Sequence, residues 1–398
     1  MAKKKSEGYL SARESRRISK ENRRITNAFE KQRKRKNVPE SEYLTQMRDP
    51  NNAVEFDNLH TYFFTDAGTV KSVDGVTFDI PIGKTVGVVG ESGCGKSVTS
   101  LSLMQLLQRP QGQIVEGAIR LNLGDKAYDI TKTPAEQMQH LRGNFISMIF
   151  QEPMTALNPV FRIGDQLDEV IALHDGEGKS KEDIKARSIH LLEMVGIANS
   201  KGVYRMYPHE LSGGMRQRVM IAMALACNPK LIIADEPTTA LDVTIQHQIL
   251  KQMRSLQEEY GTSIIFITHD LGVVAELCDR VVVLYGGLVM EEAEINDLFE
   301  NPLHPYTMGL LASIPGLTKD KSERLQSIPG SPPDMTKPPK GCPFASRCQF
   351  ARNICAAECP PFVQVGSRQA RCWLLQPDAP AEGNPLHEKL AEAERKAH

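Results

Sequence analysis

The chain has 398 residues, 40% of them apolar and 24% charged, which excludes collagen-like and wholly disordered proteins. This length suits two globular units with tails. No apolar run approaches the roughly 20 residues that span a bilayer, and the first residues lack an apolar segment of the secretory kind, so we expect a cytoplasmic protein.

Basic residues are concentrated at the N-terminus. Residues 1–36 contain 14 Lys and Arg against four Glu, although the net charge of the whole chain is −1. We expect a basic, flexible extension over residues 1–50. A solvated, partly helical tail explains the charge, and so does attraction to anionic lipid or RNA.

Apolar residues alternate in segments 53–64 and 69–80, which predicts two antiparallel strands. Shorter, continuous apolar runs follow, separated by segments with helical spacing. Such runs are typical of a mostly parallel sheet covered on both faces, so we predict an α/β fold. The five runs lie at residues 84–90, 145–150, 231–236, 263–268 and 280–285.

Two segments interrupt this alternation. Residues 153–210 contain helical stretches and no clear strand, which indicates a helical subdomain inside a larger unit spanning residues 51–315. Proline and glycine become frequent after Pro315, which predicts a small, cysteine-containing C-terminal domain and tail over residues 316–398.

The sequence GESGCGKS follows the first buried strand and opens a helix, as a phosphate-binding loop requires. Its glycines allow successive backbone N–H groups to converge on a phosphate at a helix N-terminus. Lys96 would neutralise phosphate charge, and the Ser97 hydroxyl would ligate Mg²⁺. We therefore expect ATP to be held by Gly90, Glu91, Ser92, Gly93, Cys94, Gly95, Lys96, Ser97 and Val98.

Polar side chains follow three other buried strands. Asp235 and Glu236 end one of them, where Asp235 would support Mg²⁺ and Glu236 would activate water as general base. Gln151 ends another, within reach of Mg²⁺ or the water. His269 follows a third, where its imidazole could orient Glu236 and contact the γ-phosphate.

A second anion site is predicted at LSGGMRQR, where Ser212, Gly213 and Gly214 open a long helix. One ATP molecule does not need two helix N-termini from one chain. The second site therefore points to a partner subunit.

Residues 53–300 resemble the ATP-binding-cassette (ABC) ATPases. The matching motifs are Walker A (GESGCGKS), the Q-loop glutamine (Gln151), the signature (LSGGM), Walker B (LIIADE), the D-loop (TALD) and the switch histidine (His269). The resemblance implies a P-loop cassette with an antiparallel β subdomain, and a head-to-tail dimer that encloses ATP between Walker A and the partner's signature. It also implies an aromatic residue on adenine, for which we favour Phe64 over Tyr62 and Phe63.

Longer phrases narrow the resemblance to the ATPase subunits of oligopeptide and dipeptide importers. QEPMTALNP, THDLGVVAELCDRVVVLYGG and NPLHPYTMGLL carry it, and it extends to about residue 375. It implies two transmembrane permease subunits, a second ATPase subunit of a paralogous kind, and an extracytoplasmic peptide-binding protein that acts indirectly. The chain would sit peripherally on the cytoplasmic face of the membrane, with the residues after Gln151 forming a groove for the permeases.

Five cysteines fall within residues 342–372. A reducing compartment argues against disulfides, and thiolates there suit a [4Fe-4S] cluster or Zn²⁺. In related importers this region resembles a four-cysteine iron-sulfur site, so we favour the cluster over zinc. Its ligands would be Cys342, Cys348, Cys355 and Cys372, leaving Cys359 outside.

The basic extension prompts one alternative function, a soluble ABC ATPase that acts on nucleic acid or ribosomes. Such proteins usually contain two cassettes or a long coiled-coil insert. This chain has one cassette and no heptads, so we do not expect a nucleic-acid partner.

Overall fold

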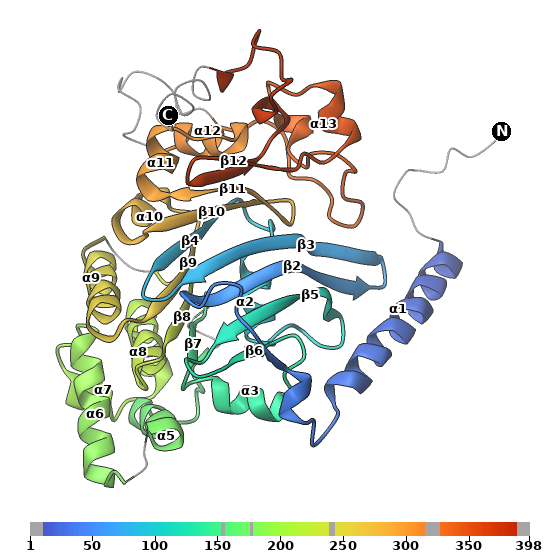
Figure 1. The fold of residues 1–398 in the computed structure, drawn as a ribbon. Helices are drawn as coiled ribbons and strands as arrows, with labels where there is room; N and C mark the ends of the chain where they lie inside the picture. The colour runs from blue at the N-terminus through green and yellow to red at the C-terminus, as the bar shows by residue number, and fades with distance from the viewer. Residues whose placement is uncertain (1–10, 153–155, 176–177, 239–242, 315–326, 388–398) are drawn as a thin grey trace.

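The computed structural model describes residues 11–152, 156–175, 178–238, 243–314 and 327–387 and contains two β-sheets (Figure 1). The smaller has five strands in the order β1-β6-β5-β2-β3, and the larger has eight in the order β12-β13-β11-β10-β4-β9-β8-β7. The strands of the smaller sheet are β1 (Leu44–Thr45), β2 (Asn52–Thr65), β3 (Gly68–Pro81), β5 (Gly112–Asn122) and β6 (Ala127–Asp129).

The five continuous apolar runs form the centre of the larger sheet, as predicted. They pair in parallel in the order β10-β4-β9-β8-β7. β11 then pairs antiparallel with β10. These strands are β4 (Thr85–Val89), β7 (Ile146–Ile149), β8 (Leu231–Asp235), β9 (Ser263–Thr268), β10 (Arg280–Tyr285) and β11 (Leu288–Glu294).

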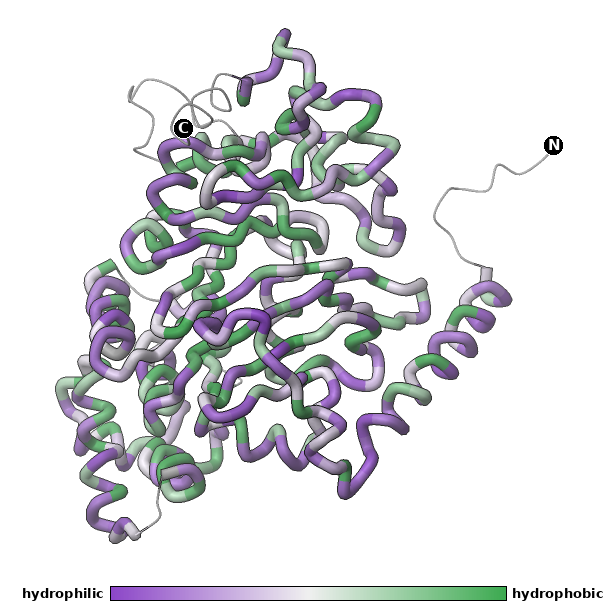
Figure 2. Tube along the Cα trace, viewed as in Figure 1, coloured by the Kyte–Doolittle hydropathy of each residue, from purple (hydrophilic) through white to green (hydrophobic). Residues whose placement is uncertain are grey.

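Each central strand contributes to two separate cores because its side chains alternate between the faces of the sheet. Ile264 and Phe266 of β9 pack in the core on the helical face. Ile265 and Ile267 pack in the core shared with the smaller sheet. Burial on both faces explains why these strands are continuously apolar, and Figure 2 shows the hydrophobic colour gathered along them.

Helices cover one face of the larger sheet and fill the insert between β7 and β8 (Figure 1). Within residues 156–210 the described elements are helical, as the sequence predicts. The main helices are α1 (Ala12–Arg33), α2 (Lys96–Leu103), α3 (Ala135–Leu141), α5 (Ile163–Asp175), α6 (Lys181–Met194), α7 (Ser200–Val203), α8 (Gly213–Leu225), α9 (Val243–Tyr260), α10 (Leu271–Leu277), α11 (Ile295–Glu300), α12 (Pro305–Ala312) and α13 (Asn353–Ala357). None of the described helices is long and apolar enough to cross a membrane.

The basic extension differs from the flexible segment predicted over residues 1–50. Its described part, residues 11–50, contains the 22-residue helix α1, which begins with a capping box between Ser11 and Glu14, and strand β1 of the smaller sheet. The buried Asn22 side chain donates a hydrogen bond to the Thr65 carbonyl at 2.7 Å, and Ser19 bonds the Asp66 carboxylate. Charge alone predicts a solvated tail because it does not reveal these contacts with the β2–β3 hairpin.

The C-terminal region also differs from the separate small domain predicted from residue 316 onward, whose first residues, to 326, lie outside the described residues. β13 (Arg368–Arg371) pairs antiparallel with β11, and β12 (Phe362–Val365) pairs with β13, so the region extends the larger sheet. Cys342 and Phe344 belong to the core of the helical face. Proline-rich composition predicts a boundary, but it cannot show that the region shares a sheet and a core with the rest of the chain.

Candidate nucleotide site and cysteine cavity

The phosphate loop lies between β4 and α2 and depends on glycine at two close approaches. A Cβ at Gly90 would lie 2.2 Å from the Leu284 carbonyl oxygen, and one at Gly95 would lie 2.5 Å from that of Ser72. Both glycines have positive φ, 150° and 107°. The loop therefore packs tightly between β10 of the larger sheet and β3 of the smaller sheet, directly before the N-terminus of α2.

Lys96 is anchored inside this loop, with only 7% of its surface exposed. Its ammonium group donates to the carbonyls of Gly90 at 2.7 Å and Glu91 at 3.0 Å, and its Nζ lies 4.0 Å from Cys94 Sγ. An ammonium group has three N–H donors, so the one nearest the weakly accepting sulfur is readily redirected to a phosphate oxygen. Cys94 is buried, and burial raises the pKa of its thiol, so it acts as a small apolar filler.

Ser97 and Asp235 meet although they are 138 positions apart, because β4 and β8 both flank β9 in parallel. The Ser97 hydroxyl donates to Asp235 Oδ1 at 3.1 Å. Burial is the main cause that raises the pKa of the Asp235 carboxyl, and the charge of Glu236 adds to it. A hydroxyl and a buried carboxylate beside a phosphate loop fit Mg²⁺, and a divalent cation would favour the ionised carboxylate.

Glu236, Gln151 and His269 converge at the same edge of the sheet, as predicted. The Gln151 amide donates to Glu236 Oε2 at 3.0 Å, and His269 Nδ1 lies 3.3 Å from Oε1. Glu236 has φ 48°, so the backbone turns immediately after β8 and its side chain departs from the direction of Asp235. The two neighbouring carboxylates therefore have different partners, Ser97 for Asp235, and Gln151 and His269 for Glu236.

The predicted second anion site lies at the start of α8. Ser212 is the N-cap residue, and its hydroxyl accepts a hydrogen bond from the Met215 N–H at 3.3 Å. Ser212 and Gly213 are exposed, and a Cβ at Gly213 would meet nothing within 4 Å. This helix N-terminus is therefore open to a phosphate group carried by a second molecule.

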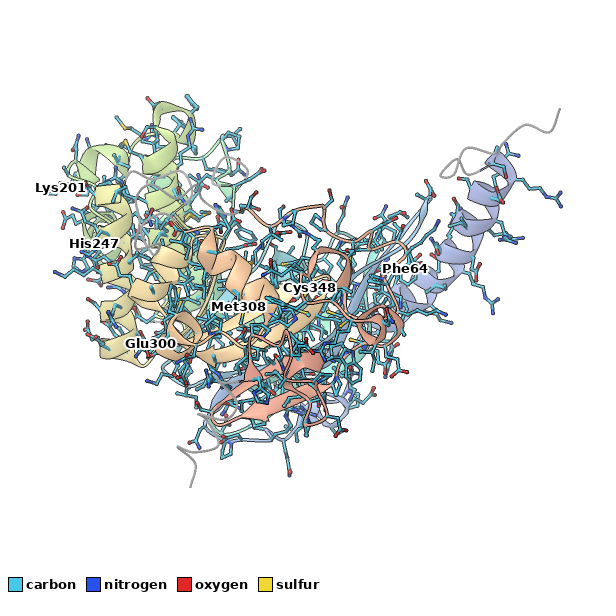
Figure 3. All side chains as sticks on the ribbon, turned by 90° about the horizontal axis from the view of Figure 1, so that it is seen from above. Phe64, Lys201, His247, Glu300, Met308 and Cys348 are labelled. Carbon is cyan, nitrogen blue, oxygen red and sulfur yellow. The ribbon has the colours of Figure 1, made fainter. Side chains whose placement is uncertain are left out.

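Of the other predicted residues, Phe64 is a half-buried residue of β2, and Figure 3 places it on the flank that carries α1, opposite Lys201 and His247. Val98 packs against the core shared with the smaller sheet. The D-loop, residues 239–242, lies outside the described residues.

The C-terminal cysteines gather around one cavity of about 20 Å³, with room for about one water molecule. The four predicted ligands line it, Cys359 does not, and none of these cysteines forms a disulfide. Burial raises the pKa of the Cys342 and Cys372 thiols to about 12. Within the described residues, no group of three or more His, Cys, Asp or Glu has the arrangement of a metal site.

Motif reasoning missed the residues that hold the phosphate loop from outside. Tyr306 of α12 accepts a hydrogen bond from the Glu91 N–H, and Arg347 pairs with the Glu91 carboxylate. It also missed Gln217, whose amide bonds the carbonyl of Pro237 and so links α8 to the residue after Glu236. Only the tertiary contacts reveal these roles, since neither residue type nor spacing marks them.

Comparisons with known proteins agree with this geometry. The family described as "ABC transporter" matches residues 73–239, and "Oligopeptide/dipeptide transporter, C-terminal region" matches residues 290–355. A solved relative, the dimeric post-hydrolysis state of the ATP-binding cassette MJ0796 bound to ADP and Pi, has a TM-score of 0.55 and 26% identity. That match covers 61% of this chain and 98% of the cassette.

Two relatives share most of their length with this chain. The oligopeptide transport ATP-binding protein OppD of Bacillus subtilis (strain 168) is 50% identical over 328 residues, or 82% of this chain and 90% of OppD. The dipeptide transport ATP-binding protein DppD of Lactococcus lactis subsp. cremoris (strain MG1363) is 49% identical over 329 residues, or 82% of this chain and 92% of DppD. The chain therefore belongs to the ABC transporter family, among its oligopeptide and dipeptide transport ATP-binding proteins.

Proposed function

We propose that this chain is the ATP-hydrolysing subunit of an ABC importer for oligopeptides or dipeptides. The observation that carries the proposal is the meeting of Gln151, Glu236 and His269 beside the Ser97–Asp235 pair. The C-terminal region that this chain shares with oligopeptide and dipeptide transporters supports peptides as the transported solute.

In this mechanism the phosphate loop and Lys96 would bind the triphosphate, while Ser97 and Asp235 would hold Mg²⁺. When bound, the cation would neutralise charge that develops on the phosphate oxygens. The Glu236 carboxylate would accept one proton from the attacking water as the water oxygen bonds the γ-phosphorus and the bond from that phosphorus to the ADP oxygen breaks. His269 and Gln151 would fix the direction of the carboxylate through their bonds to it. The signature segment of a second ATPase subunit would complete the site from the other side of the nucleotide, as Ser212 of this chain would do for the partner's site.

The permease subunits would dock in a groove of about 750 Å³ between the sheet and the helical insert. α3, β7, α5 and α8 contribute its lining, and two large apolar side chains in it are exposed, Phe150 by 37% and Leu173 by 71%. Phe150 immediately precedes Gln151, whose amide bonds the Glu236 carboxylate. A displacement of Phe150 by a docked permease would therefore shift Gln151 and, through it, Glu236. This contact would keep the chain peripherally at the cytoplasmic face of the membrane.

A substitution tests the groove. Leu173→Asp should abolish co-purification with the permeases because it buries a charge in an apolar contact, whereas nucleotide binding should be unchanged. Ile82→Asp, at a residue 53% exposed and outside the groove, is the matched control. Normal permease recovery with Leu173→Asp would reject this docking surface.

Purification of the tagged chain from detergent-solubilised membranes tests the function as a whole. We expect two permease subunits and a second, paralogous ATPase subunit to co-purify, and ATP hydrolysis to rise when a peptide-loaded binding protein is added. Recovery of ribosomes or nucleic acid without a membrane protein would instead support the soluble alternative.

The cysteine cavity would hold a [4Fe-4S] cluster, or Zn²⁺ as the alternative. Four thiols around one cavity supply the donors of either centre, and a cation would lower the thiol pKa values that burial raises. The small volume accommodates one ion directly, whereas a cluster would require the four thiols to move apart.

Iron, sulfide and zinc analysis of anaerobically purified protein distinguishes the two centres. Cys348→Ser should lose the metal, and Cys359→Ser should retain it because Cys359 does not line the cavity. Wild-type protein with neither iron nor zinc would reject the metal centre.

A further inference from the structure

The second residue of the phosphate loop is held by two elements from the C-terminal part of the chain. The Glu91 N–H donates to the Tyr306 hydroxyl at 2.8 Å. The Glu91 carboxylate accepts two hydrogen bonds from the Arg347 guanidinium, 2.6 Å to Oε2 and 3.0 Å to Oε1. This paired geometry is the strong form of an ion pair, because two parallel bonds fix both direction and distance.

Arg347 is itself rigidly placed, with only 5% of its side chain exposed. Nε donates to the Pro329 carbonyl at 2.8 Å, and the two Nη atoms also bond the Ile328 carbonyl and the Tyr285 hydroxyl. The guanidinium lies over the ring of Tyr285, 5.7 Å from its centroid. A group fixed by so many contacts can impose a position on Glu91 instead of following it.

The segment that carries Arg347 also lines the cysteine cavity. Arg347 ends a single turn of 3-10 helix, Ala345–Arg347, and Cys348 follows it directly. Phe344, Ala345 and Cys348 all line the cavity. A displacement of the Cys348 backbone would therefore also displace Arg347, which precedes it, and so alter the ion pair with Glu91.

We propose that Arg347 is a positioning residue for nucleotide binding, which holds the phosphate loop through Glu91 and couples the cysteine cavity to ATP affinity. The inference rests on the proposed ATP site. It adds Arg347 to the residues that determine ATP affinity, and it adds an effect of the cysteine cavity on that affinity. A loop held in its binding conformation does not have to be ordered by the ligand, so affinity rises. Coupling is reciprocal, so ATP must in turn affect the segment around the cavity.

Nucleotide titration of purified protein tests the positioning role. Arg347→Ala should weaken binding of a fluorescent ATP analogue by about 10-fold, as expected for loss of a charge-assisted pair, and Arg347→Lys should recover part of that loss. Glu91→Gln should weaken binding similarly, and the double variant should be no weaker than either single one. Arg368→Ala, which removes a bond to the Asn301 carbonyl in the same region, is the matched control.

Three outcomes separate the possibilities. Wild-type protein that binds no ATP would reject the proposed function itself. Wild-type affinity in Arg347→Ala, even with a lower melting temperature, would reject the positioning role and leave an ordinary stabilising ion pair. Weakened binding in Arg347→Ala with partial rescue by lysine supports the proposal.

Hydrogen exchange tests the coupling without relying on activity. The Cys342 N–H donates to the Cys355 carbonyl at 2.7 Å, so peptides covering residues 342–355 report on the cavity. Saturating ATP should slow exchange there several-fold in wild-type protein and have no effect in Arg347→Ala at equal occupancy. Equal slowing in both proteins, or none in ATP-saturated wild type, would overturn the coupling.

Discussion

Glu236 combines an unusual backbone conformation with two polar partners. Its φ of 48° separates its side chain from that of Asp235, and its carboxylate is 15% exposed between Gln151 and His269. A partly solvated carboxylate remains a usable base, while its partners fix its direction.

Replacing this carboxylate tests its role. Glu236→Gln should bind ATP with nearly wild-type affinity and lose about 100-fold or more of its hydrolysis rate, because an amide can hold the water but cannot take its proton. Phosphate release from the assembled transporter and a nucleotide titration measure the two quantities. Turnover at the wild-type rate would show that another group is the base.

Replacing Lys96 should affect nucleotide binding, whereas replacing Glu236 should affect hydrolysis. The Lys96 ammonium group is the buried cation of the loop, so Lys96→Ala should weaken nucleotide binding itself by about 10-fold or more, unlike Glu236→Gln. The same titration checks this, and an unchanged affinity would remove Lys96 from the phosphate site.

The positions of residues inside short motifs could be predicted because these residues are close together in the sequence. The glycines and Lys96 of the loop are examples. The Ser97–Asp235 bond needed the strand order as well, which the apolar runs indicate only in outline. Arg347 lies 256 positions from Glu91, and no local pattern predicts that pair.

The elements were predicted well wherever hydrophobic periodicity was strong. The central strands agree with the structure to within a residue or two at each end. The predictions were less accurate for segments whose structure depends on contacts with distant residues. These segments are α1 and the β12–β13 extension of the larger sheet. Composition describes a segment in isolation, and these segments depend on Thr65 and β11 respectively.

The buried Asn22 amide is one of the contacts that dock α1 on the β2–β3 hairpin. Asn22→Ala should cost about 1 kcal/mol of local stability, because it leaves the Thr65 carbonyl without this donor. Hydrogen exchange across α1 should become faster in this variant. Asn27→Ala, at an exposed position of the same helix, should exchange as wild type does, and equal effects of the two substitutions would contradict the docking.

The junction of β11 and α12 predicts a pH dependence. Burial raises the pKa of Glu291 to about 7 from an ordinary 4.5, although the N–H groups of Leu303 and His304 oppose the shift. Between these pH values the folded chain keeps a proton that the unfolded chain has released. The contribution of this group to folding stability therefore falls as pH rises from 4.5 to 7.

Denaturant unfolding at pH 5, 6 and 7 checks this sign. The free energy of unfolding should decline less steeply in Glu291→Gln than in wild type, by up to about 1.4 kcal/mol per pH unit. Both proteins are compared by slope, so a uniform loss of stability in the variant does not affect the result. Equal slopes would contradict the buried, protonated carboxyl.

At the scale of the whole molecule, the two predicted anion sites of one chain lie on separate elements. The phosphate loop precedes α2, and the exposed N-terminus of α8 lies among the helices that follow β7 (Figure 1). A second cassette, turned head to tail, would bring its own signature serine to the triphosphate. ATP would thereby link the two cassettes, and the groove beside Gln151 would pass their closure to the permeases.

Site-specific photo-cross-linking tests this shared site most directly. A benzophenone side chain in place of exposed His209, three residues before Ser212, would be irradiated in the assembled Glu236→Gln transporter with and without ATP. Mass spectrometry should find an ATP-dependent cross-link to the phosphate loop of the partner ATPase subunit. Cross-links confined to the same subunit, or independent of ATP, would contradict a nucleotide held between two cassettes.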